Sequence, residues 1–252
     1  MFLQRFYQGS YQRKFLTFLA GAIVASIALF ATPAFASVPK GVDRVAVQPN
    51  KVESPINIAV LIQDDLVSSV GNEIQVTADF IRTLPAGSRV LVGYITSGSL
   101  QVRQPFTTDL NSAARSLRIP SSSTSRAPYN PYVEVIEALR QFDAGWKGRN
   151  AVLLVSDGLD VSHGFDATTA GNTIDLERAT REANKRNVAV YSFYAPSVGL
   201  TSHSHLAASY GQSSLNRIAQ ETGGRAFFQG ITGFVTFDPY FSQLRQALNQ
   251  RY

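Results

Sequence analysis

The feature that most constrains the fold of this chain is an alternation between short apolar runs and segments with helical periodicity. Most of the apolar runs are rich in β-branched side chains, which is typical of strands buried on both faces of a parallel sheet. They occupy residues 56–62, 89–96, 150–156, 188–195 and 225–229. Strands that alternate with helices in this way predict a sheet covered by helices on both faces.

The segments between these runs carry apolar residues three and four positions apart, which is the spacing of one helix face. These stripes predict helices over 70–84, 132–142, 175–186 and 240–252, another that ends at Gly223, and a short one at 110–117. Only three residues separate the run 89–96 from an alternating segment at 100–106, which predicts a hairpin and an antiparallel edge strand. The sequence therefore predicts one α/β domain over residues 55–252, with a doubly wound, mostly parallel sheet.

The first 36 residues are typical of an export signal rather than of this domain. Arg5, Arg13 and Lys14 form a basic start without any acid, and residues 15–36 carry no charge and end in small residues two apart. This pattern predicts a cleaved signal peptide and an exported protein, periplasmic or extracellular. An apolar stretch of this length is also long enough to span a bilayer, so a membrane anchor formed by residues 15–36 is the alternative. The polar segment 37–54 is predicted to be a linker.

Charge and cysteine content exclude several classes of function. The formal net charge is +5, but three positive charges and no negative ones lie in residues 1–36, so the exported part carries +2. That balance leaves no basic stripe for nucleic-acid binding. The chain contains no cysteine, which excludes disulfides, thiolate zinc sites and thiol nucleophiles.

Acidic residues follow two of the predicted strands. The run 56–62 leads into Asp64 and Ser68, and the run 150–156 leads directly into Asp157. In a doubly wound sheet, ligands bind beyond the carboxyl ends of the strands, where the winding reverses. If these two strands are neighbours at that point, the three side chains converge into an oxygen-rich site suited to Mg²⁺ or Ca²⁺. The alternative is that these side chains cap helices and turns.

The order of these features resembles that of a von Willebrand factor A domain, and most of all that of the bacterial exported VWFA-related proteins. Members of this family place D-x-S-x-S after the first strand, a threonine in a later loop and an aspartate after the fourth strand. Together these residues form a metal-ion-dependent adhesion site. The resemblance implies that Asp64, Ser68 and Asp157 are metal ligands, with Mg²⁺, Ca²⁺ or Mn²⁺ as the ion.

Two departures from the family motif imply that this metal site is degenerate. Leu66 stands where the first serine is expected, and starting the motif one residue later, at Asp65, places Val67 there. No threonine is evident just before the predicted helix at 132–142, where Tyr129 and its neighbours stand. Each lost oxygen ligand weakens metal binding, because water must replace it without the same preorganisation.

The resemblance implies a non-enzymatic binding or adhesion module that recognises a protein or a cell-surface ligand, with no catalytic residue. The metal would accept a carboxylate of the partner. Two alternatives stay open, a metal-assisted hydrolase that uses Asp64, Asp157 and His163, and a structural subunit of an envelope complex.

Four loops are expected to line the contact surface, because recognition usually resides in irregular segments on a rigid scaffold. They are residues 64–72, 120–131, 157–174 and 196–212. The last loop contains His203 and His205, which are expected to be solvated rather than metal-bound.

Overall fold

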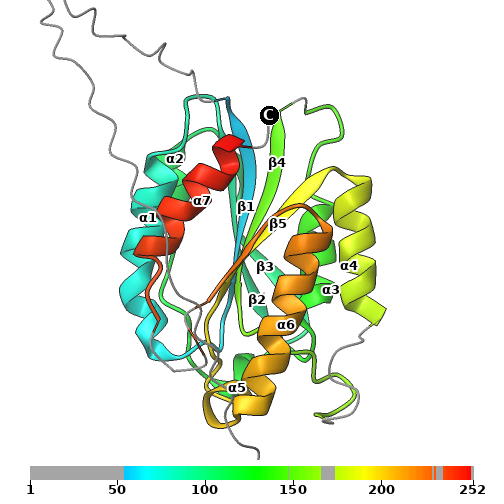
Figure 1. The fold of residues 1–252 in the computed structure, drawn as a ribbon. Coiled ribbons are helices and arrows are strands. Elements are labelled where there is room, and N and C mark those ends of the chain that lie inside the picture. Colours follow the sequence, from blue (N-terminus) through cyan, green and yellow to red (C-terminus); the bar gives the residue numbers. More distant parts are fainter. Residues whose placement is uncertain (1–53, 147, 166–173, 229, 231–234, 251–252) are drawn as a thin grey trace, which may run out of the picture. The chain divides into compact units, whose positions relative to one another are not determined.

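The computed structural model describes residues 54–146, 148–165, 174–228, 230 and 235–250 (Figure 1). The chain divides into two units, Met1–Gln48 and Pro49–Tyr252, and every described residue belongs to the second. The predicted signal peptide and all but the last residue of the predicted linker therefore lie outside the described residues. Among the helices of the described ranges, none is long and apolar enough to cross a membrane.

Six strands form one sheet in the described part of the chain, in the order β3-β2-β1-β4-β5-β6. The strands are β1 (Ile56–Gln63), β2 (Arg89–Thr96), β3 (Ser99–Thr107), β4 (Arg149–Ser156), β5 (Val188–Tyr194) and β6 (Ala226–Phe227). All neighbouring strands are parallel except β2 and β3, which are antiparallel. The predicted doubly wound sheet with one antiparallel edge strand is confirmed, and its winding reverses between β1 and β4.

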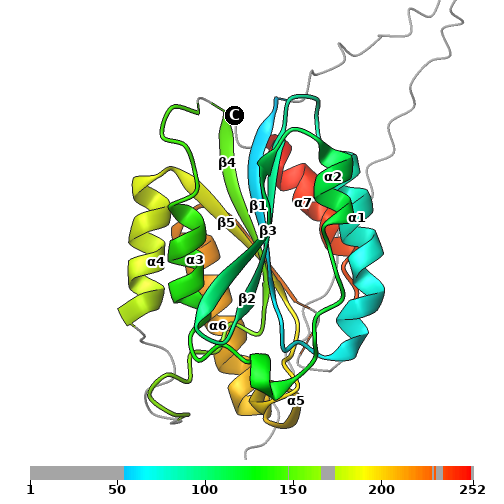
Figure 2. The ribbon, with the colours of Figure 1, turned by 180° about the vertical axis from the view of Figure 1, so that it is seen from behind.

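Helices cover both faces of this sheet (Figures 1 and 2). One face packs against α1 (Ile74–Arg82), α2 (Leu110–Arg115) and α7 (Asp238–Gln250). The other packs against α3 (Pro131–Leu139), α4 (Ile174–Lys185) and α6 (His205–Glu221). Three shorter pieces complete the described elements: α5 (Leu200–His203) and the 3₁₀ turns η1 (Ser68–Glu73) and η2 (Thr124–Arg126).

Alternation along β1 divides the apolar core into two layers. Ile58, Val60 and Ile62 pack towards α1 and α7, whereas Ala59 and Leu61 pack towards α3 and α6. Each of these side chains is at most 1% exposed, so β1 is buried on both faces. Burying a side chain such as Val or Leu stabilises the fold by about 1.5–3 kcal/mol.

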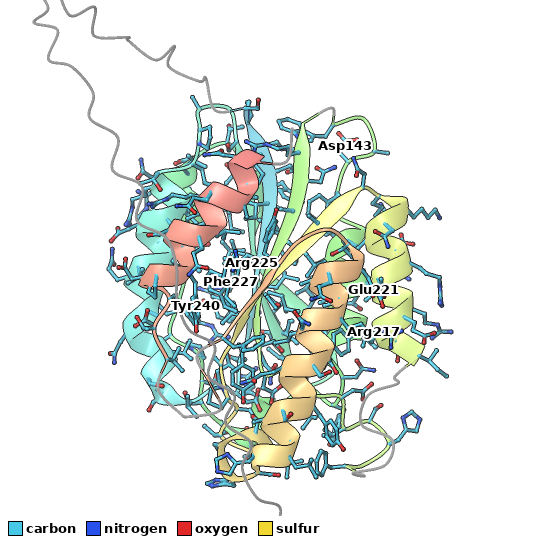
Figure 3. All side chains as sticks on the ribbon, in the orientation of Figure 1. Asp143, Arg217, Glu221, Arg225, Phe227 and Tyr240 are labelled. Carbon is cyan, nitrogen blue, oxygen red and sulfur yellow. The ribbon has the colours of Figure 1, made fainter. Side chains whose placement is uncertain are left out.

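Aromatic rings anchor α7 to the sheet. The ring of Phe193 in β5 lies 5.0 Å from that of Phe241 and 5.2 Å from that of Tyr240. Phe227 of β6 is 5.7 Å from Tyr240, and both are marked in Figure 3. Edge-to-face contacts of this kind stabilise the packing beyond the buried area alone.

The structure corrects the prediction that residues 196–212 form a loop. His203 is the last residue of α5, and His205 is the first residue of α6. Ser204 separates the two helices and caps α6, because its Oγ accepts a hydrogen bond from the backbone N–H of Ala207 at 3.2 Å. A serine at this position is a known helix-start signal, but the Ser- and His-rich composition obscured it. Both histidines are exposed, as predicted.

Candidate functional site

The carboxyl ends of β1 and β4 lie side by side at the point where the winding reverses. Ile62 pairs with Val155 in the register of the two strands, so the residues that follow each strand are close neighbours. Three carboxyl groups lie at this end. Asp64, Asp65 and Asp157 are 0%, 2% and 5% exposed. The three carboxyl groups differ in whether a positively charged side chain accompanies them.

Asp64 is paired with an arginine of the chain itself. Its Oδ1 and Oδ2 accept hydrogen bonds from the two terminal nitrogens of Arg118, at 2.6 and 2.9 Å. The backbone N–H and the hydroxyl of Ser121 donate to the same two oxygens, each at 2.9 Å. Burial raises the pKa of Asp64, but these hydrogen bonds outweigh burial and hold the pKa below its ordinary value. Asp64 is therefore a carboxylate whose counterion is already present.

Arg118 is fixed in turn by Tyr94 of β2. Its guanidinium lies 4.0 Å from the centre of the Tyr94 ring, a cation–π contact. The Tyr94 hydroxyl donates to the backbone carbonyl of Arg118 at 2.6 Å and accepts from its backbone N–H at 2.7 Å. The backbone N–H of Ser122 also donates to the carbonyl of Asp64, at 3.1 Å. Asp64 thus ties the segment 118–122 to the ends of β1 and β2.

Asp65 has no cationic partner among the described residues. Its Oδ1 accepts a hydrogen bond from Nε2 of Gln63 at 2.7 Å. Burial, together with the nearby charge of Asp157, raises the pKa of Asp65 to about 7. Two buried carboxyl groups therefore face one another without a counterion from the described part of the chain. We call Asp65 and Asp157 the acid pair.

Asp157 is held by neutral donors only. The backbone N–H of Leu159 and the hydroxyl of Thr201 each donate to its carboxylate at 3.1 Å. Burial raises the pKa of Asp157 despite these hydrogen bonds. Oε1 of Gln63 accepts from the Ser156 hydroxyl at 2.5 Å and from the Asp157 backbone N–H at 3.2 Å. Since the same Gln63 side chain also donates to Asp65, it joins the two halves of the acid pair.

The loop after β5 is hydrogen-bonded to the segment that carries Asp65. Val67 donates its backbone N–H to the carbonyl of Pro196, and Val198 donates to the carbonyl of Asp65, each at 2.9 Å. The Thr201 hydroxyl accepts from the backbone N–H of Ser197 at 2.8 Å. Three segments far apart in sequence are thus hydrogen-bonded around the acid pair.

Two hydroxyl groups in this region are buried without a hydrogen-bond partner in the described structure. They belong to Ser69, in the η1 turn that follows Asp65, and to Tyr194, at the end of β5. Buried polar groups are normally satisfied, so such atoms commonly mark a missing water or ion. Carboxylate and hydroxyl oxygens are the ligands that Mg²⁺, Mn²⁺ and Ca²⁺ prefer. The donor types around the acid pair therefore fit a hard divalent cation, although no cluster of three acidic or histidine side chains exists in the described residues.

The three predicted metal ligands have separate environments. Asp157 belongs to the acid pair, whereas both carboxylate oxygens of Asp64 are engaged by Arg118 and Ser121. Ser68 opens the η1 turn and is exposed, while the neighbouring Ser69 hydroxyl is buried. The structure thus brings Asp157 together with Asp65, one residue later than the sequence suggested.

Large apolar side chains are exposed mainly at this same end of the sheet. Val133, Ile174 and Leu206 lie in the first turns of α3, α4 and α6, which begin beside the carboxyl ends of the strands (Figure 1). Ile119 and Tyr129 lie between α2 and α3, and Leu200 is the first residue of α5. We call these six residues the carboxyl-end face. The adjoining segment 195–216 contains no Asp, Glu, Lys or Arg.

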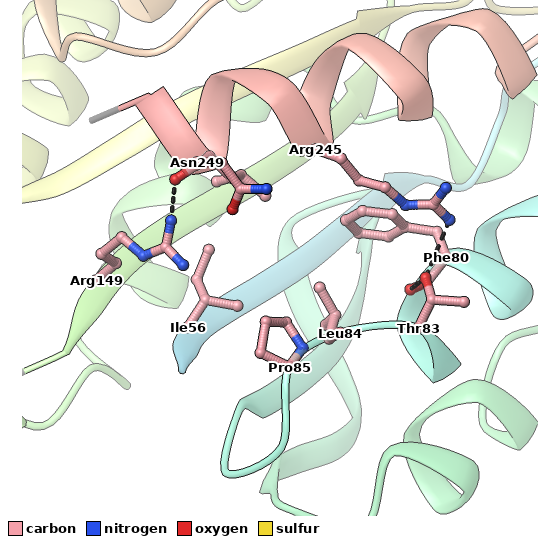
Figure 4. Close-up of a pocket in the computed structure, with 9 residues that line it drawn as sticks. Ile56, Phe80, Thr83, Leu84, Pro85, Arg149, Arg245 and Asn249 are labelled. Atoms are coloured by element: carbon pink, nitrogen blue, oxygen red, sulfur yellow. Dashed lines mark hydrogen bonds between the residues drawn. The ribbon is translucent and has the colours of Figure 1, made fainter. Parts of the chain in front are cut away.

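A small cavity lies at the opposite end of the sheet. The cavity in Figure 4 has a volume of about 30 Å³, which is enough for one water molecule. It is lined by apolar residues such as Ile56 and Leu84, with Arg149 and Arg245 at its edge. Arg149 donates to the backbone carbonyl of Leu248, and Arg245 donates to the hydroxyl of Thr83 at 3.0 Å. This cavity therefore closes the packing of α7 and is a poor candidate for a ligand site.

No protein-family model and no curated protein matches this sequence. Solved structures do match. An aerotolerance-related membrane protein from Bacteroides fragilis superposes with a TM-score of 0.53 and 13% identity, over 78% of this chain and 99% of that chain. BatB from Bacteroides thetaiotaomicron, a conserved hypothetical protein, superposes with a TM-score of 0.52 and 16% identity, over 78% of this chain and 99% of that chain.

A von Willebrand factor type A protein from Catenulispora acidiphila superposes with a TM-score of 0.53 and 15% identity, over 77% of this chain and 43% of that chain. The chain therefore has the von Willebrand factor A fold, as the resemblance predicted. Identities this low establish the fold alone, because one architecture serves many functions.

Proposed function

We propose that this chain is an exported, non-enzymatic binding module that recognises a protein or a cell-surface ligand through the carboxyl-end face. A divalent cation held by the acid pair, Mg²⁺ or alternatively Mn²⁺ or Ca²⁺, supports this recognition. The proposal rests on two features that lie at the same end of the sheet. A buried acid pair without a counterion in the described structure lies beside a surface of exposed apolar side chains.

Electrostatics supports a cation at the acid pair. Two carboxylates buried near each other repel, and burial removes the water that would screen them. Either one carboxyl keeps its proton or a cation neutralises both. A divalent ion bound to Asp65 and Asp157 would neutralise both carboxylates. The Ser69 hydroxyl, which has no hydrogen-bond partner in the described structure, would be a further oxygen ligand. Thr201 would then orient Asp157 by its hydrogen bond, as outer residues commonly do at metal sites.

The carboxyl-end face supports a protein as the partner. Exposed apolar side chains grouped on one surface are typical of protein interaction sites. A bound cation with an open position would add a carboxylate of the partner to this contact. Because the adjoining segment 195–216 carries no formal charge, it offers nothing to a phosphate backbone or an anionic membrane.

No observation favours the hydrolase alternative. His163 lies on an exposed turn, where its Nδ1 is 3.1 Å from the hydroxyl of Ser162. That hydroxyl also lies 2.6 Å from Asp160, which places these three residues in a local turn. Asp157 is instead bonded to Leu159 and Thr201.

The cation is tested by thermal unfolding of the exported protein in EDTA and in increasing Mg²⁺ or Mn²⁺. Free ion at one hundred times its dissociation constant is expected to stabilise the fold by about 2.7 kcal/mol, with a matching rise in midpoint. Asp157→Asn should abolish this rise. Asp160→Asn is the matched control, because it removes an acid from the same loop outside the acid pair. A wild-type midpoint that stays constant up to millimolar metal would reject the cation.

Export is tested by the amino terminus of the mature protein. Signal-peptide cleavage after Ala36 predicts that the protein recovered outside the cytoplasmic membrane begins at Ser37. Recovery of a membrane-bound form that retains residues 15–36 would support the anchor instead.

A further inference from the structure

Tyr194 is the last residue of β5 and lies next to the acid pair. Its side chain packs on the same face of the sheet as Val188 and Val190, towards α6, and it pairs in register with Ser156 of β4. Asp157 directly follows Ser156. The fold therefore places a phenol beside the loop that carries one half of the acid pair.

The hydroxyl of Tyr194 differs from those of other buried tyrosines. Tyr132 donates its hydroxyl to the carbonyl of Gly158 at 2.7 Å, and Tyr94 donates to the carbonyl of Arg118 at 2.6 Å. Tyr194 is 6% exposed, and its hydroxyl has no hydrogen-bond partner in the described structure. Because buried tyrosine hydroxyls usually find a partner, this one points to a group that binds there from outside the chain.

The neighbours of Tyr194 show where that group belongs. Burial raises the pKa of Tyr194, the nearby charge of Asp157 raises it further, and the Thr201 hydroxyl lowers it. A tyrosine phenol carries its proton at ordinary pH and can act as a hydrogen-bond donor. Thr201, the other close neighbour, already shares its hydroxyl among the backbone of Ser197, the hydroxyl of Ser197 and the carboxylate of Asp157. Asp157 is therefore the charged side chain that acts on the Tyr194 phenol.

We infer that Tyr194 is a positioning residue, whose hydroxyl donates through one water molecule into the acid pair and holds Asp157 ready for the cation. The inference rests on the proposed function. A bridging water is required because no direct hydrogen bond joins Tyr194 to Asp157 in the described structure. Water-mediated hydrogen bonds of this kind are nearly as favourable as direct ones, and residues that orient metal ligands change metal affinity by about 10–100-fold.

The test compares Tyr194→Phe with Tyr240→Phe in the exported protein. Tyr240 is the matched control, because it is also 6% exposed but packs on the opposite face of the sheet, against Phe193. Mn²⁺ affinity is measured from the electron paramagnetic resonance signal of the free ion, and metal-free stability from unfolding in EDTA. Tyr194→Phe should weaken Mn²⁺ binding by about tenfold and leave the metal-free midpoint unchanged or raised. Tyr240→Phe should leave Mn²⁺ affinity within about twofold of wild type.

A second readout detects the phenol itself in the wild-type protein. Mn²⁺ or Mg²⁺ binding should produce a near-ultraviolet difference spectrum of tyrosine that Tyr194→Phe abolishes and Tyr240→Phe retains. Equal Mn²⁺ affinity and an equal spectrum in wild type and Tyr194→Phe would overturn the inference and leave the proposed function standing. Wild-type protein that binds no Mn²⁺ would overturn both.

Discussion

Asp64 and Asp65 are adjacent in the sequence and equally buried, yet they belong to opposite kinds of site. The carboxylate of Asp64 accepts hydrogen bonds from Arg118 and Ser121, and its pKa is lowered. The carboxyl of Asp65 faces Asp157, and its pKa is raised to about 7. The difference arises from the side chains that the fold brings to each carboxyl. Asp64 receives an arginine from the loop after α2, and Asp65 receives a second acid from the loop after β4.

This contrast distinguishes a structural acid from a candidate binding site. Asp64 holds the segment 118–122, and with it the exposed Ile119, against the sheet. The acid pair has two charges that the described chain leaves uncompensated, which is the arrangement expected where a cation binds. Perturbed carboxyl groups of this kind favour function over structure, although structural networks can produce them as well.

The largest expected effect comes from removing the counterion of Asp64. Arg118→Met leaves a fully buried carboxylate without its cation and should lower the free energy of unfolding by about 3 kcal/mol. Urea unfolding in EDTA at pH 8 measures this loss. Arg126→Met is the control, because it removes an exposed arginine in the same loop and should change stability by less than about 0.5 kcal/mol. A loss below about 1 kcal/mol for Arg118→Met would show that Asp64 is not a structural acid.

Replacing each aspartate by asparagine should change stability in opposite directions. Asp64→Asn weakens the bonds to Arg118 and should destabilise the metal-free protein by about 2 kcal/mol at pH 8. Asp65→Asn removes a repelled, buried charge and should stabilise the metal-free protein by about 1 kcal/mol. Both values come from urea unfolding in EDTA. Effects of the same sign would contradict the contrast between the two residues.

The pH dependence of stability gives the same contrast between Asp64 and Asp65. The folded pKa of Asp65, about 7, lies above its ordinary value of 3.8, so the folded state binds more protons between these pH values. Metal-free stability should therefore fall as pH rises from about 4 to 7. Asp64 contributes the opposite sign. Its lowered pKa adds stability above pH 4 that is lost on further acidification.

Asp65→Asn should remove the fall in stability between pH 4 and 7 and keep the loss at lower pH. Unfolding midpoints in EDTA across pH 3–8 measure both branches. A wild-type curve that coincides with that of Asp65→Asn between pH 4 and 7 would show that the pKa of Asp65 is not raised in the folded protein.

The sheet could be predicted because its signals are local. The continuous apolar run of β1 and the three-and-four spacing of α1 each appear within one short segment of sequence. The hairpin from β2 to β3 was equally local. The start of α6 was missed, because Ser204 and the two histidines beside it carry no apolar stripe, and the helix depends on a cap and on burial of Ala207 and Ala208.

The candidate site could be predicted only to within one residue. Sequence spacing places acids after β1 and β4, but it does not show which of Asp64 and Asp65 faces Asp157. That choice depends on Arg118, which lies 54 positions from Asp64 and reaches it only in the folded chain. The contribution of Gln63, which joins Asp65 to Asp157 by its side-chain amide, likewise follows from strand register rather than from any motif.

Mn²⁺ binding to two neighbouring asparagine variants tests the central claim most directly. Electron paramagnetic resonance titration of free Mn²⁺ should give wild-type affinity for Asp64→Asn and at least a tenfold loss for Asp65→Asn. Loss of binding in Asp64→Asn together with full binding in Asp65→Asn would contradict the assignment of the cation to the acid pair.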